Sequence, residues 1–215
     1  DPCRSRGLGD VYKRQARYAP WQEVQLLDGL ADRVLDGSIS EIGVSNIGPK
    51  RLAWMQQRLA ERGVPLRSVQ VQYSLLSPGD AKVDALRQLC RERGIEVLAY
   101  SPLAFGVLTM PPDGERRPRT VLQRQLLARL QPASRSLRAV VAAIACQRSV
   151  SMAQVALNWC RAQGTTPIPG LRTPEQARDV AGALQWSLTS AELDQLTVAR
   201  QQCTVRTPSN PFQSA

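Results

Sequence analysis

Apolar residues recur along this chain with the spacing of helices, and short β-rich runs separate the helical stretches. Apolar positions three and four residues apart share one face of a helix, whereas a short apolar run between turn residues is typical of a buried strand. The pattern predicts helices over residues 22–35, 49–62, 81–93, 121–148 (broken near Pro132), 152–163, 174–184 and 190–202. It predicts strands over residues 39–45, 69–73, 95–100 and 165–169.

Residues that start or stop helices support these bounds. Gly37, Gly63 and Gly94 follow predicted helices, and glycine readily adopts the left-handed conformation that ends a helix. Ser151 and Ser190 stand at the starts of two others, where a serine side chain caps the first turn.

Strands that alternate with helices predict an α/β fold with a parallel sheet, because each helix returns the chain to the same end of the sheet. Two architectures fit this alternation: an open doubly wound sheet, or part of a (β/α)8 barrel. A barrel needs eight strands and the pattern predicts four. The barrel interpretation therefore requires that further chain precedes these strands.

The first fifteen residues differ from the rest, because they show no periodicity and mix Gly, Arg and Asp. Residues 10–15, Asp-Val-Tyr-Lys-Arg-Gln, translate the DNA string GAT GTG TAT AAG AGA CAG, which is similar to the adapter of transposase-made sequencing libraries. We therefore expect residues 1–15 to be a disordered leader of adapter origin. On the barrel interpretation, residues 16–215 would be the C-terminal part of a single barrel domain.

The formal net charge is +10, from 28 basic and 18 acidic residues, and every basic residue is Arg except Lys13, Lys50 and Lys82. The Arg residues are scattered over helical stretches, which favours solvated helix surfaces over a nucleic-acid-binding face. Nucleic-acid binding stays open as an alternative, and its mark would be an affinity that falls steeply with salt. Histidine is absent, which excludes Ser-His-Asp and Cys-His nucleophiles and His-ligated metals. We expect no metal site.

The five cysteines include no CxxC pair, which favours a reducing compartment, and we expect the cytoplasm. No apolar run approaches the ~20 residues that a membrane span needs, so we expect no membrane partner.

Polar residues follow the predicted strands where ligands bind in both architectures, beyond the carboxyl ends of the strands. The amides of Asn46 and Gln70 suit a carboxamide, and the ring of Tyr100 suits stacking on a flat heteroaromatic ring. The last strand–helix junction adds Arg172 and backbone N–H groups for a phosphate. Each residue taken singly also has an ordinary structural explanation, such as turn chemistry at Ser45-Asn46.

The combination resembles a known family. The segments IGVSN, VQVQYSLL, RERGIEVLAYSPLAFGVLT, MAQVALNWC and PIPGLRTPEQARDVAGAL are similar, in this order, to the aldo-keto reductases, most of all their bacterial, cyanobacterial and plant plastid branch. The resemblance covers about residues 17–203. It implies a (β/α)8 barrel, of which this chain would supply about strands 5–8 with their helices. It also implies an NADP(H) cofactor and the reduction of aldehydes or ketones by hydride transfer from the nicotinamide.

The resemblance implies a set of cofactor-binding positions. Three would hold the nicotinamide carboxamide: Ser45, Asn46 and Gln70. Tyr100 would stack under the nicotinamide, and the pyrophosphate loop would contain Ser101, Leu103 and Gly106. The 2′-phosphate and adenosine would meet Gly170, Leu171, Arg172, Gln176 and Asp179. The chain departs from the family at Val180, where the family usually has Asn.

No catalytic residue carries over. The resemblance puts the family's Asp, Tyr, Lys and His on the first four strands, and the matching sequence starts after them, near Arg17-Tyr18. We therefore expect this chain to be an inactive fragment of an NADP(H)-dependent oxidoreductase, whose full-length parent takes a small carbonyl substrate. A cofactor-binding regulatory module of the same barrel family, without turnover, is the alternative. The sequence leaves the oligomeric state open.

Overall fold

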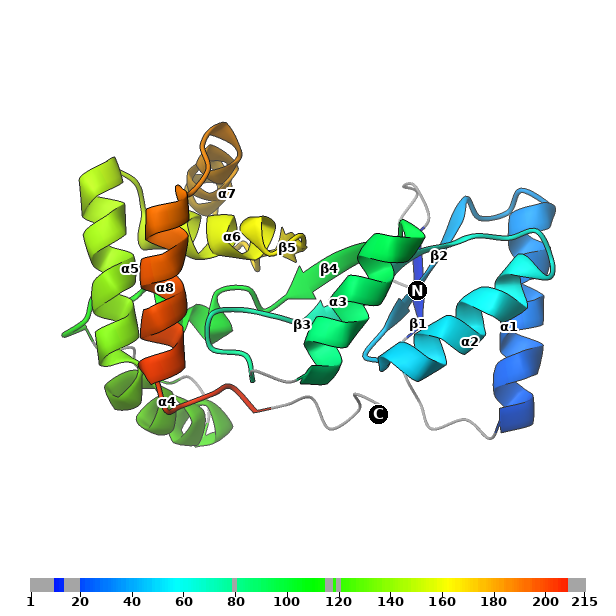
Figure 1. Cartoon of the computed structure of the whole chain (residues 1–215), viewed down its shortest axis with the longest axis horizontal. Coiled ribbons are helices and arrows are strands. Elements are labelled where there is room, and N and C mark those ends of the chain that lie inside the picture. Colours follow the sequence, from blue (N-terminus) through cyan, green and yellow to red (C-terminus); the bar gives the residue numbers. More distant parts are fainter. Residues whose placement is uncertain (1–9, 14–19, 79–80, 115–117, 119–120, 209–215) are drawn as a thin grey trace. The chain divides into compact units, whose positions relative to one another are not determined.

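The computed structural model describes residues 10–13, 20–78, 81–114, 118 and 121–208 (Figure 1). The chain divides into two compact units. The first contains Asp1–Val71, Asp80–Val97 and Asn210–Ala215, and the second contains Gln72–Gly79 and Leu98–Ser209. Strands β3 (Leu66–Gln72) and β4 (Glu96–Tyr100) pass from one unit to the other.

The first unit alternates strands with helices, as the sequence predicts. Its further elements are β1 (Asp10–Lys13), α1 (Pro20–Leu35), β2 (Glu41–Ser45), α2 (Pro49–Ala60) and α3 (Ala81–Arg93). Strand β2 pairs in parallel with both β1 and β3, and its Ile42 and Val44 are buried. Buried apolar residues on a strand flanked by helices are typical of a parallel sheet.

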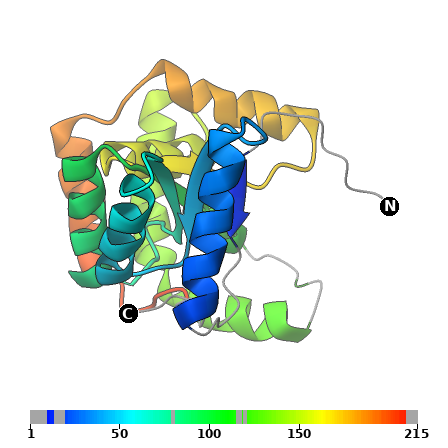
Figure 2. The ribbon, with the colours of Figure 1, turned by 90° about the vertical axis from the view of Figure 1, so that its right-hand side faces the viewer.

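Helices α1 and α2 lie side by side in this unit (Figure 2). Arginines of α2 and the turn after it bind acids of α1, with Arg58 Nη2 2.7 Å from Asp28 Oδ2 and Arg62 Nη2 2.6 Å from Asp32 Oδ1. The pKa of Asp28 is lowered, chiefly by the hydrogen bond from Arg58. These contacts explain part of the arginine content as pairing between helices.

The second unit holds the remaining elements. They are η1 (Ala104–Thr109), α4 (Val121–Ala133), α5 (Arg135–Arg148), α6 (Met152–Ala162), β5 (Thr166–Ile168), α7 (Pro174–Gly182), η2 (Ala183–Gln185) and α8 (Ser190–Gln202). Strand β5 pairs in parallel with β4. Helices α5 and α8 pack against one another, and each supplies a buried leucine to the core.

Strand order follows chain order, with β1-β2-β3 paired in that sequence in the first unit and β4-β5 in the second. A doubly wound sheet reverses its order at a switch point, whereas a barrel adds each strand beside the last. The order therefore decides between the two predicted architectures, and the chain has the parallel α/β fold of part of a (β/α)8 barrel.

Strand β1 differs from the prediction of a leader without regular structure. Residues Asp10–Lys13 pair with β2, with Val11 opposite Ile42. The physical reason is that β2 offers an open edge of backbone N–H and C=O groups, and Val and Tyr favour strands. Residues 1–9 and 14–15 lie outside the described residues, and the adapter origin stays a prediction.

Helix caps confirm one prediction and correct another. The Ser151 side chain accepts from the backbone N–H of Gln154, as expected for a cap of α6. Helix α8 is capped by Thr189 and not by Ser190, because Glu192 lies three residues after Thr189 and completes a reciprocal capping box with it. The long helix predicted over residues 121–148 divides at Ser134, two residues after Pro132.

Arg138 is buried in the second unit and is partnered by carbonyl groups. Its guanidinium donates to the carbonyls of Pro111 and Gln131, the latter at 2.9 Å. Burial lowers the pKa of Arg138. The side chain ties α5 to the loop after η1 through Pro111 and to α4 through Gln131.

A second charged group joins α5 to α8. Arg148 donates to both carboxylate oxygens of Glu192, at 2.6 and 2.7 Å, and its guanidinium lies 5.4 Å from the ring centre of Trp186. The hydrogen bond from Arg148 lowers the pKa of the Glu192 carboxyl from 4.5 to about 2. The ionised pair therefore fixes the start of α8 against the end of α5.

Among the described helices none is by itself long and apolar enough to cross a membrane; α5 and α6 meet that length and composition only as a pair bent by 102°.

Replacing Glu192 by Gln removes the charge while keeping the shape of the side chain. We expect the melting temperature at pH 7 to fall by roughly 3–8 °C, because a charged bidentate contact is lost. The folded-state pKa of Glu192 is lowered, so its stabilisation is complete above about pH 4.5 and is lost as the pH falls toward 2. The variant lacks this part of the pH dependence, which thermal melts between pH 7 and pH 3 measure.

Asp84→Asn is the matched control, since that carboxylate is 69% exposed and pairs within its own helix. Its melting temperature should change by less than about 1 °C. Equal shifts in the two variants would contradict a specific contribution from the Arg148–Glu192 pair.

Candidate functional site

A cavity of about 670 Å³ lies in the second unit, beyond the carboxyl ends of β4 and β5. Fourteen residues line it: Ser101, Pro102, Leu103, Phe105, Gly106, Thr109, Ala153, Ile168, Gly170, Leu171, Arg172, Gln176, Asp179 and Val180. The lining thus contains every site residue that the sequence predicts between positions 101 and 179. Segments about 70 residues apart in the chain meet here because parallel strands end at the same edge of a sheet.

The remaining predicted residues are placed elsewhere. Tyr100 ends β4 half-buried and is not part of the cavity lining. In the first unit, Ser45 Oγ lies 3.5 Å from Gln70 Oε1, and the N–H of Asn46 donates to the carbonyl of Gln70 at 2.9 Å. Asn46 has a left-handed backbone (φ 57°), which Asn tolerates better than most residues. These three residues form a polar cluster at the ends of β2 and β3.

One wall of the cavity is a strained turn. Ala104, Phe105 and Gly106 have successive φ values of 48°, 59° and 84°. The left-handed conformation costs a residue with a Cβ atom roughly 1–2 kcal/mol, and only Gly106 avoids that cost. The turn is closed by the N–H of Gly106 to the carbonyl of Leu103, at 2.9 Å. Such strain concentrates at functional sites.

The opposite wall is the start of α7. Thr173 caps this helix through Oγ1, which accepts from the N–H of Gln176, and the Gln176 side chain accepts from the N–H of Arg172 at 2.8 Å. Arg172 is exposed, and its guanidinium makes no hydrogen bond or ion pair with any residue that the structure describes. A helix N-terminus beside an arginine is suited to binding an anion.

Helix α7 is held to α6 by a residue that the sequence analysis missed. Gln154 Nε2 donates to Asp179 Oδ1 at 3.0 Å, and Gln154 Oε1 accepts from Trp186 Nε1 at 3.0 Å. Arg161, also on α6, donates to the carbonyl of Trp186 at 3.2 Å. The sequence signal that could have found Gln154 is its amide side chain between the apolar residues Ala153 and Val155, in a helix that is otherwise largely buried.

The ionisable groups of the cavity lining are Arg172 and Asp179. Within the described residues, no group of three or more His, Cys, Asp or Glu side chains is placed to hold a metal ion. The arrangement offers a cation, a helix N-terminus, hydroxyls and glycine backbone, which are groups that bind and orient a phosphorylated ligand.

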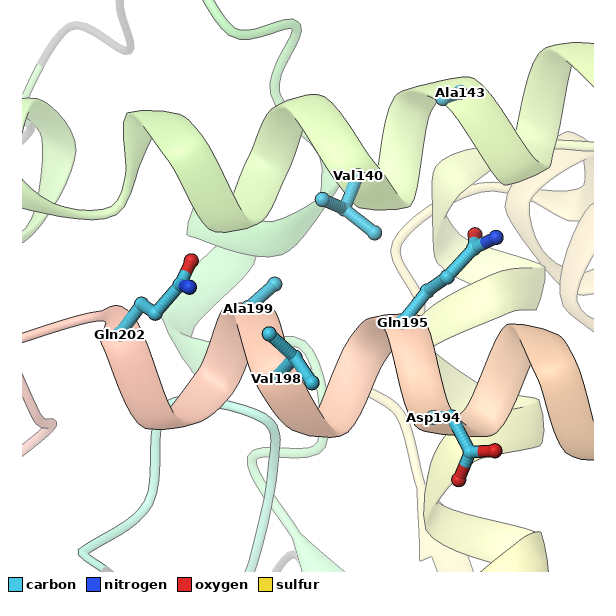
Figure 3. Close-up of a pocket in the computed structure, with 7 residues that line it drawn as sticks. All are labelled: Val140, Ala143, Asp194, Gln195, Val198, Ala199 and Gln202. Atoms are coloured by element: carbon cyan, nitrogen blue, oxygen red, sulfur yellow. The ribbon is translucent and has the colours of Figure 1, made fainter.

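A second cavity, of about 460 Å³, lies between α5 and α8 (Figure 3). Its lining includes Val140 and Ala143 on α5 and Val198 and Ala199 on α8, and Asp194 is the ionisable group of the lining. It lacks the cation and the helix N-terminus of the first cavity. We therefore take the cavity at the ends of β4 and β5 as the functional site.

A parallel α/β chain with a phosphate-suited cavity at its strand ends is typical of cofactor-binding barrel proteins. Residues 16–200 match the aldo/keto reductase family, and the chain belongs to that family. It is 40% identical over 211 residues to pyridoxal reductase, chloroplastic, of Arabidopsis thaliana, covering 97% of this chain and 56% of the relative. It is 33% identical over 184 residues to an uncharacterized oxidoreductase of Mycobacterium tuberculosis, covering 81% and 53%.

A solved structure shares the fold. A thermostable aldo-keto reductase, crystallised with the inhibitor epalrestat, aligns with a TM-score of 0.63 at 22% identity. The alignment covers 88% of this chain and 58% of that one. The chain thus spans about half the length of the curated relatives that it matches.

Phe105→Gly and Phe105→Ala test the strain in the turn. Both variants lose the same ring, but only Gly removes the cost of the left-handed conformation. We expect the Gly variant to be more stable than the Ala variant by about 1 kcal/mol in urea unfolding. The opposite order is expected at Ala128, an exposed position within α4, where Gly replaces Ala at a cost of about 1 kcal/mol. A turn without strain would give the same order at both sites.

Proposed function

We propose that this chain carries the NADP(H)-binding part of an aldo-keto reductase that reduces aldehydes or ketones. The cavity at the ends of β4 and β5 carries the proposal, because it joins the predicted pyrophosphate turn to the predicted 2′-phosphate segment. Family membership supports an oxidoreductase. The choice of NADP(H) rests on Arg172, whose guanidinium is available to a further phosphate.

The residues present fit this cofactor. A volume of about 670 Å³ lies within the usual range for pockets that bind small molecules and cofactors. Nothing lies within 4 Å of the position that a Cβ atom would take at Gly170, so the backbone there leaves room for a ligand. The Asp179 carboxylate accepts hydrogen bonds only, which suits the amino group of adenine. Val180 presents no donor or acceptor, so the base contact relies on Asp179.

When bound, the nicotinamide supplies a hydride to the carbonyl carbon of a substrate. The protein's part, in this proposal, is to bind and orient. Arg172 and the first turn of α7 neutralise the 2′-phosphate, and the turn around Leu103 takes the pyrophosphate. Ser45, Asn46 and Gln70 keep the role that the family resemblance implies, which is to hold the carboxamide. Tyr100 keeps its implied role under the nicotinamide ring.

For the whole protein we propose a heteroaromatic aldehyde as substrate. The support is the 40% identity, over 97% of this chain, to a protein named pyridoxal reductase, since pyridoxal is such an aldehyde.

The lack of a CxxC pair still favours a reducing compartment, and the cytoplasm remains our proposal.

We further propose that the present chain binds the cofactor without turnover. Arg172 and Asp179 are the ionisable groups at the cavity, and the family's catalytic Tyr and Lys match no position in this sequence. A missing general acid forfeits roughly 10²–10⁴-fold in rate. The same observation supports the second candidate, a regulatory module that binds NADP(H) and performs no reduction.

Arg172→Leu tests the cofactor assignment. We expect the affinity for NADPH to fall by about 10–100-fold and the affinity for NADH to change little, because only NADPH carries the 2′-phosphate that the guanidinium would meet. Titration of nucleotide fluorescence measures both affinities. Arg178→Leu is the control: this residue is exposed on the same helix and pairs with Glu175 at 3.4 Å. Equal losses for both nucleotides, or no NADPH binding by the wild type, would refute the assignment.

Turnover has its own test. We expect this chain, mixed with NADPH and pyridoxal, to leave the NADPH absorbance unchanged, and the Arabidopsis protein named pyridoxal reductase is the positive control. Oxidation by this chain within 10²-fold of that relative's rate would show that a proton donor has been overlooked.

A further inference from the structure

Helix α7 forms a wall of the binding cavity although none of its residues is buried. A surface helix is normally held by an apolar face packed on the core. Helix α6 shows the contrast, because its buried residues include Val155, Leu157 and Trp159. The apolar residues of α7 are at most half-buried, so the polar contacts of Gln154 take a larger part in fixing its position.

The amide of Gln154 fits its surroundings in one orientation. Its Nε2 donates to the carboxylate of Asp179 and its Oε1 accepts from the indole N–H of Trp186, each at 3.0 Å. Turning the amide over would set its oxygen against a carboxylate and its NH2 against an N–H donor. Both contacts would then be repulsive, so the two partners lock the side chain.

The backbone of α7 also approaches this amide closely. A Cβ atom at Gly182 would lie 2.7 Å from Gln154 Nε2 and 3.1 Å from Cδ. Only glycine allows this contact without displacement of the amide. Gln154 therefore meets α7 at two places, at the side chain of Asp179 and at the backbone of Gly182.

We propose that Gln154 is a positioning residue for the ligand cavity. Gln154 does not line the cavity itself. It acts through Asp179, which does line the cavity. Gln154 fixes the position of the Asp179 carboxylate and of the α7 backbone. It thereby sets the distance between the ligand and the start of that helix. This inference rests on the proposed function, since the ligand it positions for is the dinucleotide.

The charged groups around this contact come from three helices. Asp179 faces the amide from α7, Arg161 on α6 donates to the carbonyl of Trp186, and Arg148 on α5 lies over the Trp186 ring. A carboxylate in place of the amide would thus face the Asp179 carboxylate directly, while both arginines contact Trp186. Two facing carboxylates share a proton as the pH falls, because one of their pKa values is raised.

Gln154→Glu turns this geometry into a pH-dependent test. At pH 8 we expect NADPH to bind about tenfold more weakly than to the wild type, and at pH 5.5 the deficit should shrink to threefold or less as a shared proton restores the contact. Gln147→Glu is the matched control, because it adds the same charge at an exposed position on α5 and should show no deficit at either pH. A purely structural loss would be equal at both pH values and would overturn the inference, as would wild-type affinity at pH 8.

A second measurement keeps the inference separate from the proposed function. Hydrogen exchange of α7 amides, followed by mass spectrometry without nucleotide, should be at least fivefold faster in Gln154→Leu than in the wild type, with α8 unchanged. If the wild type does not bind NADPH, the proposed function fails and the role in ligand positioning falls with it. If exchange in α7 is unchanged in Gln154→Leu, the positioning itself is refuted whatever the nucleotide result.

Discussion

The structure depends on one constraint: parallel strands joined by helices bring the carboxyl end of every strand to the same edge of the sheet. Strands β4 and β5 obey it in parallel register, with Tyr100 opposite Ile168. The loops that follow them are therefore neighbours, although most of the second unit lies between them in the chain. The cavity is a consequence of this pairing, since its walls are the continuations of the two strands.

The two walls of the cavity meet different physical demands. A wall that a ligand can reach cannot also bury its surface in the core. The turn after β4 has three successive left-handed residues, and its neighbours Val107 and Leu108, which are fully buried, anchor it to the core. Helix α7 has no buried residue of its own; it is held by directional contacts from Gln154 and Arg161 and by the buried Ala183 that follows it. The two walls of the cavity are thus held in different ways, the turn by its strained backbone and buried neighbours and α7 by hydrogen bonds.

The sequence predicts those features that depend on neighbours along the chain. Helices Ala81–Arg93 and Ser190–Gln202 have the bounds predicted from periodicity and end signals. Strand Asp10–Lys13 was not predictable, because its reason is an open edge elsewhere in the sheet. The role of Gln154 escaped for the same reason, since its partner Asp179 is 25 residues away. Arg172 was predicted from its place at the last strand–helix junction, whereas the other predicted residues of the cavity came from a family resemblance.

The arginines show how the same side chain serves structure and function. Arg148 binds a carboxylate, and the buried Arg138 binds carbonyl groups, so both guanidinium groups have partners within the fold. Arg172 stands at the mouth of a cavity and has no such partner among the described residues. A charge left unpaired beside a helix N-terminus adds to the positive potential there instead of cancelling it. The net charge of +10 is therefore less informative than this one position, where the fold leaves a cation facing a cavity that fits an anion.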